Sequence, residues 1–183
     1  MNFNRHSELT GKHAFLSPSS SAWLNYDEQK LEARYHTRRS ALRGTDLHAL
    51  AHEAIRLGVA LEASQGAIAA YVDDALEYGL VCEQHLFYSE NCFGSADTIG
   101  FRDGLLRISD LKTGIVATTF RQLHVYDALF CLEYHVDPFE IEHELRIYQR
   151  DEIRIDNPDP SLIDSIMEKI VHFDNQIEQF KED

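Results

Sequence analysis

The chain contains 183 residues, of which 44% are hydrophobic and 26% are charged, so it can bury a core and is neither a disordered nor a fibrous protein. Its length suits one domain with one continuous core. The 17 Lys and Arg residues against 31 Asp and Glu residues give a net charge of −14, which excludes a general basic coat for nucleic acid. Any contact with DNA therefore depends on a local basic patch or on a bound metal ion.

No segment has the composition of a membrane span or of a secretory signal. The sequence contains no run of about 18 apolar residues and no basic stretch followed by an apolar one. We therefore expect a cytoplasmic protein with no membrane partner. The three cysteines, Cys82, Cys92 and Cys131, form no Cys-x-x-Cys pair, so we expect reduced and mostly buried thiols.

The N-terminal part of the chain is expected to be helical. A capping-type cluster at residues 17–21 predicts a short helix directly after it. Good helix formers predict a second helix over 27–43, and apolar residues at spacings of three and four predict a third over 44–59. A fourth helix is expected over 64–78, with Gly79 as its C-terminal cap. The second helix carries the densest basic stretch of the chain: Arg34, Arg38, Arg39 and Arg43.

After Gly79 the hydrophobic pattern changes to that of β-strands. Residues 80–88 are rich in β-branched and aromatic side chains and predict a strand. Two further strands are expected over 95–102 and 105–112. The Asp103-Gly104 turn between them predicts that these two strands form a hairpin.

The remaining elements are a helix, a strand and a final helix. Thr118 or Thr119 is expected to cap a helix that runs to about His135, and alternating residues predict a half-buried strand over 139–147. A C-terminal helix is expected over 159–181. Its apolar face is predicted to contain Leu162, Ile166, Ile170, Phe173 and Ile177. This order of elements predicts a domain of the α/β class in the broad sense, a mixed α+β domain.

The chemically informative residues lie on the predicted hairpin. Asp110 and Lys112 are two apart on one strand, so their side chains leave the same face, and Asp97 lies on the preceding strand. Two carboxylates and a lysine are typical of metal-dependent phosphodiester hydrolysis, in which oxygen ligands hold Mg²⁺ or Mn²⁺. Taken alone, Asp110 and Lys112 also fit a solvated strand face.

Four short motifs resemble the PD-(D/E)XK nuclease superfamily, in particular its RecB-like branch. Gly94-Ser95-Ala96-Asp97, followed by Leu-Arg-Ile-Ser-Asp-Leu-Lys-Thr-Gly at 106–114, resembles the active-site hairpin of that superfamily. Residues 122–126 resemble the Q-x-x-x-Y motif of the branch, and residues 44–48 resemble its G-x-x-x-H motif. The motifs occur in the family's order. The expected helix-strand-strand-strand-helix-strand order is also that of the superfamily core, a restriction-endonuclease-like fold with a central mixed sheet flanked by helices.

The resemblance implies one nuclease-like domain over 1–183. Within it we expect an N-terminal helical region at 1–43, a catalytic core at 44–150 and the C-terminal helix at 159–181. The segments Leu16-Ser17-Pro18-Ser19-Ser20-Ser21 and Tyr148-Gln149-Arg150 look similar to phage-encoded members of the branch.

The resemblance also implies roles for individual residues. The catalytic residues would be Asp97, Asp110 and Lys112, with Lys112 positioning or activating the attacking water. Mg²⁺ or Mn²⁺ would be held by His48, Asp97, Asp110 and the backbone carbonyl of Leu111, while Glu83 is a candidate ligand for a second ion or an ordinary surface acid. Gln122 and Tyr126 are the expected substrate-binding residues, and their shared helical face would allow them either to contact DNA or to brace Lys112. Further candidates for DNA binding are Arg34, Arg38, Arg39 and Arg43.

Each of these side chains also has an ordinary structural alternative. The histidine could be satisfied in the core, the Gln and Tyr could be half-buried side chains, and the arginines could form a solvated helix face. Some relatives hold an iron-sulfur cluster through four cysteines, whereas this chain has three, so we expect no cluster.

The expected function is that of a metal-dependent deoxyribonuclease, an exonuclease in phage or bacterial DNA recombination, repair or processing. A first alternative is an accessory protein that keeps the nuclease fold without cutting and binds DNA ends or a partner protein. A second is an interaction module, in which the acidic surface and the C-terminal helix mediate assembly with a basic partner. The expected partners are DNA as substrate and a further copy of the chain or a phage or host recombination partner.

Overall fold

The computed structural model describes residues 14–114 and 118–182. The chain divides into two compact units, Met1–Arg43 and Gly44–Asp183. The expectation of a single domain stays a prediction. None of the helices in the two described ranges is both long enough and apolar enough to cross a membrane.

The first unit contains a 3₁₀-helix and the start of a long α-helix. The 3₁₀-helix η2 spans Pro18–Asn25, and the indole of Trp23 donates a hydrogen bond of 2.9 Å to the carbonyl of Ser17. Helix α1 spans Glu28–Leu57, and the Asp27 carboxylate accepts from an amide of its first turn. The prediction of two helices separated at Gly44 was wrong, because good helix formers on both sides carry one helix through this glycine.

The second unit is built on a five-stranded mixed sheet in the order β1-β2-β3-β4-β5. All neighbouring strands are antiparallel except β3 and β4, which are parallel. Parallel strands need a crossover, and helix α3 provides it. The bounds are β1 Val81–Ser89, β2 Cys92–Arg102, β3 Leu105–Lys112, α3 Arg121–Tyr134, β4 Glu142–Gln149 and β5 Glu152–Asp156. A mixed α+β architecture is confirmed.

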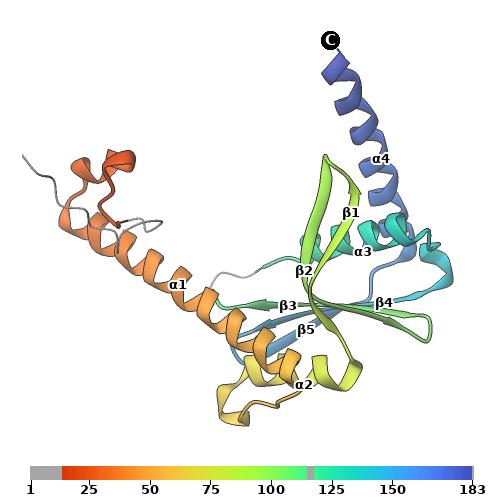
Figure 1. The fold of residues 1–183 in the computed structure, drawn as a ribbon, viewed down its shortest axis with the longest axis horizontal. Coiled ribbons are helices and arrows are strands. Elements are labelled where there is room, and N and C mark those ends of the chain that lie inside the picture. Colours follow the sequence, from red (N-terminus) through yellow and green to blue (C-terminus); the bar gives the residue numbers. More distant parts are fainter. Residues whose placement is uncertain (1–13, 115–117, 183) are drawn as a thin grey trace, which may run out of the picture. The chain divides into compact units, whose positions relative to one another are not determined.

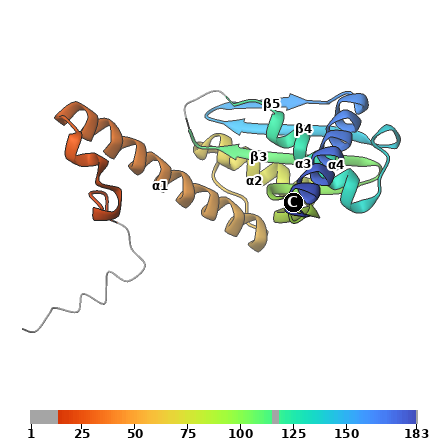
Figure 2. The ribbon, with the colours of Figure 1, turned by 90° about the horizontal axis from the view of Figure 1, so that it is seen from above.

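Helices cover both faces of this sheet. Helix α2, Ala67–Tyr78, lies on one face, and α3 and α4, Pro160–Glu182, lie on the other (Figure 1, Figure 2). As predicted, Gly79 ends α2 in the left-handed conformation. One hydrophobic cluster joins the sheet to α3 and α4, and a second joins Leu111 and Tyr148 to α2 and the last turns of α1.

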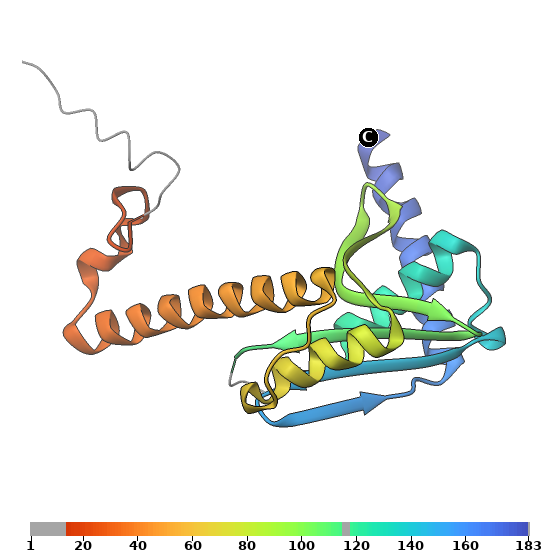
Figure 3. The same cartoon turned by 60° about the horizontal axis from the view of Figure 1, so that its bottom comes forward.

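The β1–β2 hairpin bends away from the sheet, and its tip lies beside α4 (Figure 1, Figure 3). Two side chains at the tip bond to this helix. The Ser89 hydroxyl donates 2.6 Å to Asp174, and the Asn91 amide donates to both Asp174 and Glu178. The end of the hairpin is therefore fixed by polar contacts.

Several expected elements differ in the structure. Strand β4 begins at Glu142 because Pro138–Glu140 form a 3₁₀-turn in which Asp137 accepts from the amide of Phe139. Phe139 is accordingly 61% exposed rather than in a strand. The short edge strand β5 was not predicted. Its five residues lie directly after a turn and leave Ile153 and Ile155 exposed.

Two predicted helix features and one cysteine prediction also need correction. Helix α3 begins at Arg121 with no side-chain cap, while the carbonyl and hydroxyl of Thr118 accept from Arg154 instead. In α4 the fully buried apolar residue is Ile163, and the expected Leu162 is exposed. Among the cysteines, Cys131 is buried, but Cys82 and Cys92 are partly exposed.

Candidate functional site

The predicted carboxylates meet where two strands of the sheet part. The last ladder pair between β2 and β3 joins Thr98 to Ser109. The next residue on each strand is a carboxylate, Asp97 on β2 and Asp110 on β3. From these two acids onward β2 and β3 no longer pair with each other: β2 pairs only with β1, and β3 pairs only with β4. We call this place, where Asp97 and Asp110 stand between the diverging strands, the fork.

Asp97 bridges this fork and contacts the helix α1. Its Oδ2 accepts a hydrogen bond of 3.2 Å from the backbone amide of Leu111. Leu111 lies beyond the last residue of β3 that pairs with β2. The same oxygen lies 3.5 Å from Nδ1 of His48. Thus His48 and Asp97, which the family resemblance implies as metal ligands, lie close together. The contact of Asp97 with Leu111 uses the backbone amide, and the role of the Leu111 carbonyl stays a prediction.

Asp110 is buried, with only 3% of its surface exposed. Its Oδ1 accepts 2.8 Å from Nζ of Lys112, but its Oδ2 has no hydrogen-bond partner among the described residues. Burial raises the pKa of Asp110 above its usual value, the lysine opposes this, and the nearby carboxylate of Asp97 adds to it. A buried carboxylate oxygen without a partner is costly, and a cation beside it removes that cost.

Lys112 is held from a second side by helix α3. Its Nζ donates 3.2 Å to Oε1 of Gln122, and the amide of Gln122 donates 3.2 Å to the hydroxyl of Tyr126. These two residues share a helical face because they are four apart. The geometry therefore places the predicted Gln and Tyr as a brace for the lysine.

The backbone of Gly94 lies against the ring of Tyr126. A Cβ at this position would come within 2.9 Å of Cε1 of the ring. A Gly94→Ala substitution is therefore expected to push the ring away and misplace Gln122 and Lys112. We expect the proposed cleavage to fall by about 10- to 100-fold, because small misplacements of reacting groups are costly. The measurement is the initial rate on DNA together with the melting temperature, which should stay close to that of the wild type.

A double-mutant cycle provides the control for this prediction. Tyr126→Ala removes the ring that the new methyl group would meet. In the Tyr126→Ala background, Gly94→Ala should therefore cause little further loss. Equal losses in both backgrounds would show that Gly94 acts in some other way.

A second histidine, which the sequence analysis did not single out, lies one turn after His48 on α1. The rings of His48 and His52 are edge-on with centroids 6.0 Å apart. Nδ1 of His52 lies 3.5 Å from Oε1 of Glu83, and its Nε2 is buried without a partner among the described residues. Glu83 lies between the ladder pairs Cys82–Thr98 and Gln84–Ala96 of β1 and β2, and its φ is 53°. The spacing of four between the two histidines was the signal that could have identified His52.

The Tyr148-Gln149-Arg150 segment lies beside the lysine strand. The buried hydroxyl of Tyr148 donates to Asp74 of α2, and the amide of Gln149 donates 2.7 Å to the carbonyl of Gly114. Gln149 is also the ladder partner of Lys112. The segment thus holds β4 against the end of β3.

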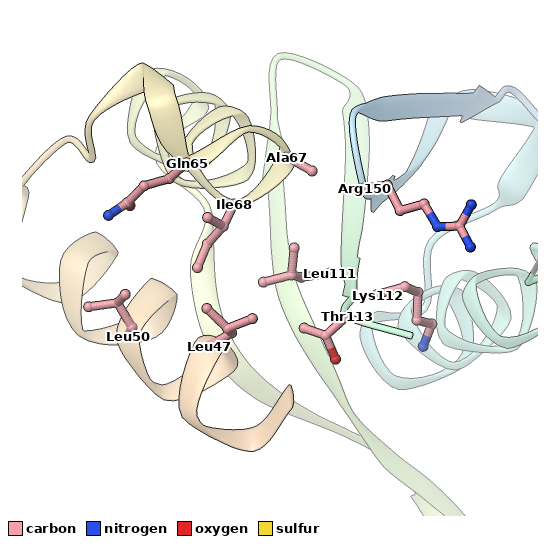
Figure 4. Close-up of a pocket in the computed structure, with 9 residues that line it drawn as sticks. All are labelled: Leu47, Leu50, Gln65, Ala67, Ile68, Leu111, Lys112, Thr113 and Arg150. Carbon is pink, nitrogen blue, oxygen red and sulfur yellow. The ribbon is translucent and has the colours of Figure 1, made fainter. Parts of the chain in front are cut away.

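A pocket of about 400 Å³ opens next to Lys112 (Figure 4). Leu47, Leu50, Ile68 and Leu111 gather on one side of it, while Lys112 and Arg150 lie on the other. Its lining is completed by Gln65, Ala67 and Thr113. The pocket therefore combines an apolar wall with two cationic side chains.

The four candidate arginines all belong to the first unit. Arg34, Arg39 and Arg43 are exposed, and the guanidinium of Arg38 lies 5.8 Å from the ring centroid of Phe15. Their part in substrate binding stays a prediction.

The fork contains the kinds of ligand atom that a hard divalent cation binds, but they do not yet form a complete metal site. Two carboxylates, a backbone carbonyl and an imidazole suit Mg²⁺ or Mn²⁺. Across residues 14–114 and 118–182, no three His, Cys, Asp or Glu side chains converge tightly enough to hold a metal ion as they stand. The observation that fits a cation is the buried oxygen of Asp110.

Comparisons with known proteins do not identify a family. No protein-family model matches the chain, and a search of curated proteins finds no match either. The resemblance to PD-(D/E)XK nucleases therefore stays an expectation from the four sequence motifs.

Proposed function

We propose that the chain is a metal-dependent deoxyribonuclease with a PD-(D/E)XK core, which hydrolyses phosphodiester bonds of DNA. The observation that carries this proposal is the fork at Asp97 and Asp110, with an unpartnered buried carboxylate oxygen next to a braced lysine. Its setting would be phage or bacterial DNA recombination, repair or processing in the cytoplasm, and its mode of action that of an exonuclease.

The residues at the fork would hold Mg²⁺ or Mn²⁺. The ligands would be His48, Asp97, Asp110 and the carbonyl of Leu111, and Glu83 is a candidate ligand for a second ion. When bound, such an ion supplies a Lewis acid for the phosphoryl oxygens and lowers the pKa of bound water.

The side chains of the chain supply orientation and positive charge. Lys112 is held by Asp110 and Gln122, so its ammonium is fixed in direction before substrate arrives. From there it can hold the attacking water or offset the charge that develops on the phosphate. The apolar wall of the neighbouring pocket suits a base or sugar, and the guanidinium of Arg150, which also lines the pocket, suits a phosphate.

The test is a cleavage assay on end-labelled linear and closed circular DNA, single- and double-stranded, with Mg²⁺, Mn²⁺ or EDTA. We expect linear DNA to be degraded with either metal ion and to persist in EDTA. Cutting of the circles would identify an endonuclease instead. DNA binding without cleavage of any substrate would favour a non-cutting accessory protein.

A further inference from the structure

One face of the β1–β2 hairpin carries a row of residue pairs that leads outward from the candidate site. The strand register places Phe87 opposite Phe93 and His85 opposite Ser95, and Asp97 follows two residues further on. Side chains two apart on a strand share a face, so Phe93, Ser95 and Asp97 lie on the same side of β2. On the opposite face of the hairpin, Leu86 and Ala96 are part of the hydrophobic core.

The outer pair of this row is an exposed aromatic stack. The rings of Phe87 and Phe93 lie with their centroids 6.3 Å apart and their planes at 29°. Their exposed fractions are 50% and 66%, so neither contributes to the buried core. The next pair inward is polar, since the hydroxyl of Ser95 is hydrogen-bonded to Nδ1 of His85.

The position of this stack is fixed by contacts from the other side. The amide of Phe87 donates 2.8 Å to Glu133 of α3, and the tip of the hairpin is bonded to α4 through Ser89 and Asn91. A binding surface that is already ordered loses less conformational entropy when its ligand arrives.

The distance from the stack to the fork matches a short run of nucleotides. Phe93 and Asp97 are four residues apart on one strand, which corresponds to about 13 Å at roughly 3.3 Å per residue. Stacked nucleotides rise about 3.4 Å each, so this span covers roughly four of them.

We propose that Phe87 and Phe93 form a stacking platform for the bases of a single DNA strand whose phosphate is cut at the fork. This inference rests on the proposed nuclease function and deepens it by naming a contact that selects a single-stranded end. Base stacking on aromatic rings is worth about 1–3 kcal/mol per base and tolerates any sequence. It also needs no positive charge, which suits a chain whose net charge of −14 repels phosphates as a whole.

The experiment measures binding separately from cleavage. Fluorescence anisotropy of a labelled single-stranded oligothymidylate is recorded in the presence of Mg²⁺, with every variant built on Lys112→Ala so that no DNA is cut. Phe87→Ala and Phe93→Ala should each weaken binding about 5-fold or more, and the double variant should weaken it further. The matched control is Phe139→Ala, which removes an equally exposed Phe outside the hairpin and should leave binding unchanged.

Two further readouts make the outcome decisive. Phe93→Trp should retain binding, and its indole fluorescence should be quenched by the oligonucleotide beyond any change from Trp23, the only tryptophan of the chain. With Lys112 intact, hydrolysis of bis(p-nitrophenyl) phosphate reports on the fork alone and should be unchanged in Phe87→Ala/Phe93→Ala.

Unchanged oligonucleotide binding by the double variant would overturn the platform, whatever its cleavage activity. If that variant instead loses a self-association that light scattering detects in the wild type, the stack is a protein interface and the proposal is also overturned. The nuclease function is tested independently of both results by comparing bis(p-nitrophenyl) phosphate hydrolysis in the wild type and in Lys112→Ala. Hydrolysis that is lost in Lys112→Ala supports the nuclease function.

Discussion

An Asp110→Asn variant is expected to lose metal-dependent cleavage by about 10³-fold or more and yet to unfold at a higher temperature than the wild type. The loss follows because groups that stabilise a transition state electrostatically are typically worth about 10²–10³-fold each, and this carboxylate would also be a metal ligand. The gain follows because the carboxylate is buried with an unpartnered oxygen, and its raised pKa shows that the fold disfavours its charge. The isosteric amide removes that charge and fills the same space.

Two measurements test this prediction. Melting temperatures are compared at pH 7 in EDTA, where Asp110→Asn should exceed the wild type. Adding Mn²⁺ should then raise the melting temperature of the wild type and leave that of the variant almost unchanged, since only the wild type retains the ligand.

Lys112→Ala is the matched variant that separates chemistry from metal binding. It should also abolish cleavage, but the melting temperature should still rise with Mn²⁺ because the carboxylates remain. Retained full activity in Lys112→Ala would refute the role of the lysine. A variant Asp110→Asn that melts lower than the wild type in EDTA would show that the carboxylate stabilises the fold.

The second large effect is expected from a buried His–Asp pair away from the fork. Asp127 of α3 and His143 of β4 are both almost completely buried, and Nδ1 of His143 lies 2.9 Å from Oδ2 of Asp127. Nε2 of the same ring faces the carbonyl of Pro138 at 2.9 Å. Both ring nitrogens therefore face oxygen atoms, an arrangement that suits an imidazolium donating to Asp127 and to the carbonyl of Pro138.

His143→Ala is expected to cost about 3–5 kcal/mol of unfolding free energy, because it leaves the Asp127 carboxylate buried without its partner. Chemical denaturation at pH 6 measures this cost. The control is His36→Ala, which removes an exposed histidine 3.6 Å from Glu32 and should change stability by less than about 0.5 kcal/mol. Replacing both partners, as in Asp127→Leu/His143→Phe, should cost less than His143→Ala alone, because no buried charge is left over.

The pair also predicts how stability depends on pH. Burial alone would lower the pKa of His143, but its hydrogen bonds to Asp127 and Pro138 outweigh this and raise it. A raised histidine pKa gives stability that is complete below the unfolded value of about 6.5 and is lost as the pH rises through the folded value. Burial raises the pKa of Asp127 as well, so its contribution is also lost with rising pH, from about pH 3.9 upward.

Above pH 6.5 the wild type should therefore lose stability relative to His143→Ala, by at most about 1.4 kcal/mol per pH unit. Burial raises the pKa of Cys131, which donates to Asp127, to about 12, so this thiol stays neutral over the range. Denaturation curves at pH 6 and pH 9 for both proteins measure the difference. Parallel changes in the two proteins would show that the ring is not charged in the fold.

The sequence predicted which acids and lysine come together at the fork but not how the strands part there. Spacing alone predicted that Asp97 and Asp110 lie on neighbouring strands with Lys112 on the face of Asp110. It could not predict that β2 and β3 separate directly beside the acids, because strand separation depends on which partner each strand finds. For the same reason the contact of His52 with Glu83 was missed, since it joins a helix to a strand far along the chain.

The errors in the fold have similarly local causes. An interior glycine was interpreted as a helix boundary, although Gly44 continues α1 and its backbone lies close to the side chain of Thr113. Strand β5 is too short to show a clear period. The helices and strands with long apolar patterns, such as α2 and β3, were predicted to within a few residues.

The crossover helix α3 has a consequence for when the candidate site becomes complete during folding. Asp97 lies on β2 and Asp110 on β3. These strands and β1 pair with their neighbours in sequence and can form early. Gln122 accepts a hydrogen bond from Lys112 and reaches this position only when α3 packs on the sheet. That step accompanies the pairing of β3 with β4, which lie far apart in sequence and therefore pair slowly. A nascent or partly unfolded chain would thus carry its acids without an aligned lysine, which would confine the proposed DNA cleavage to the completed fold.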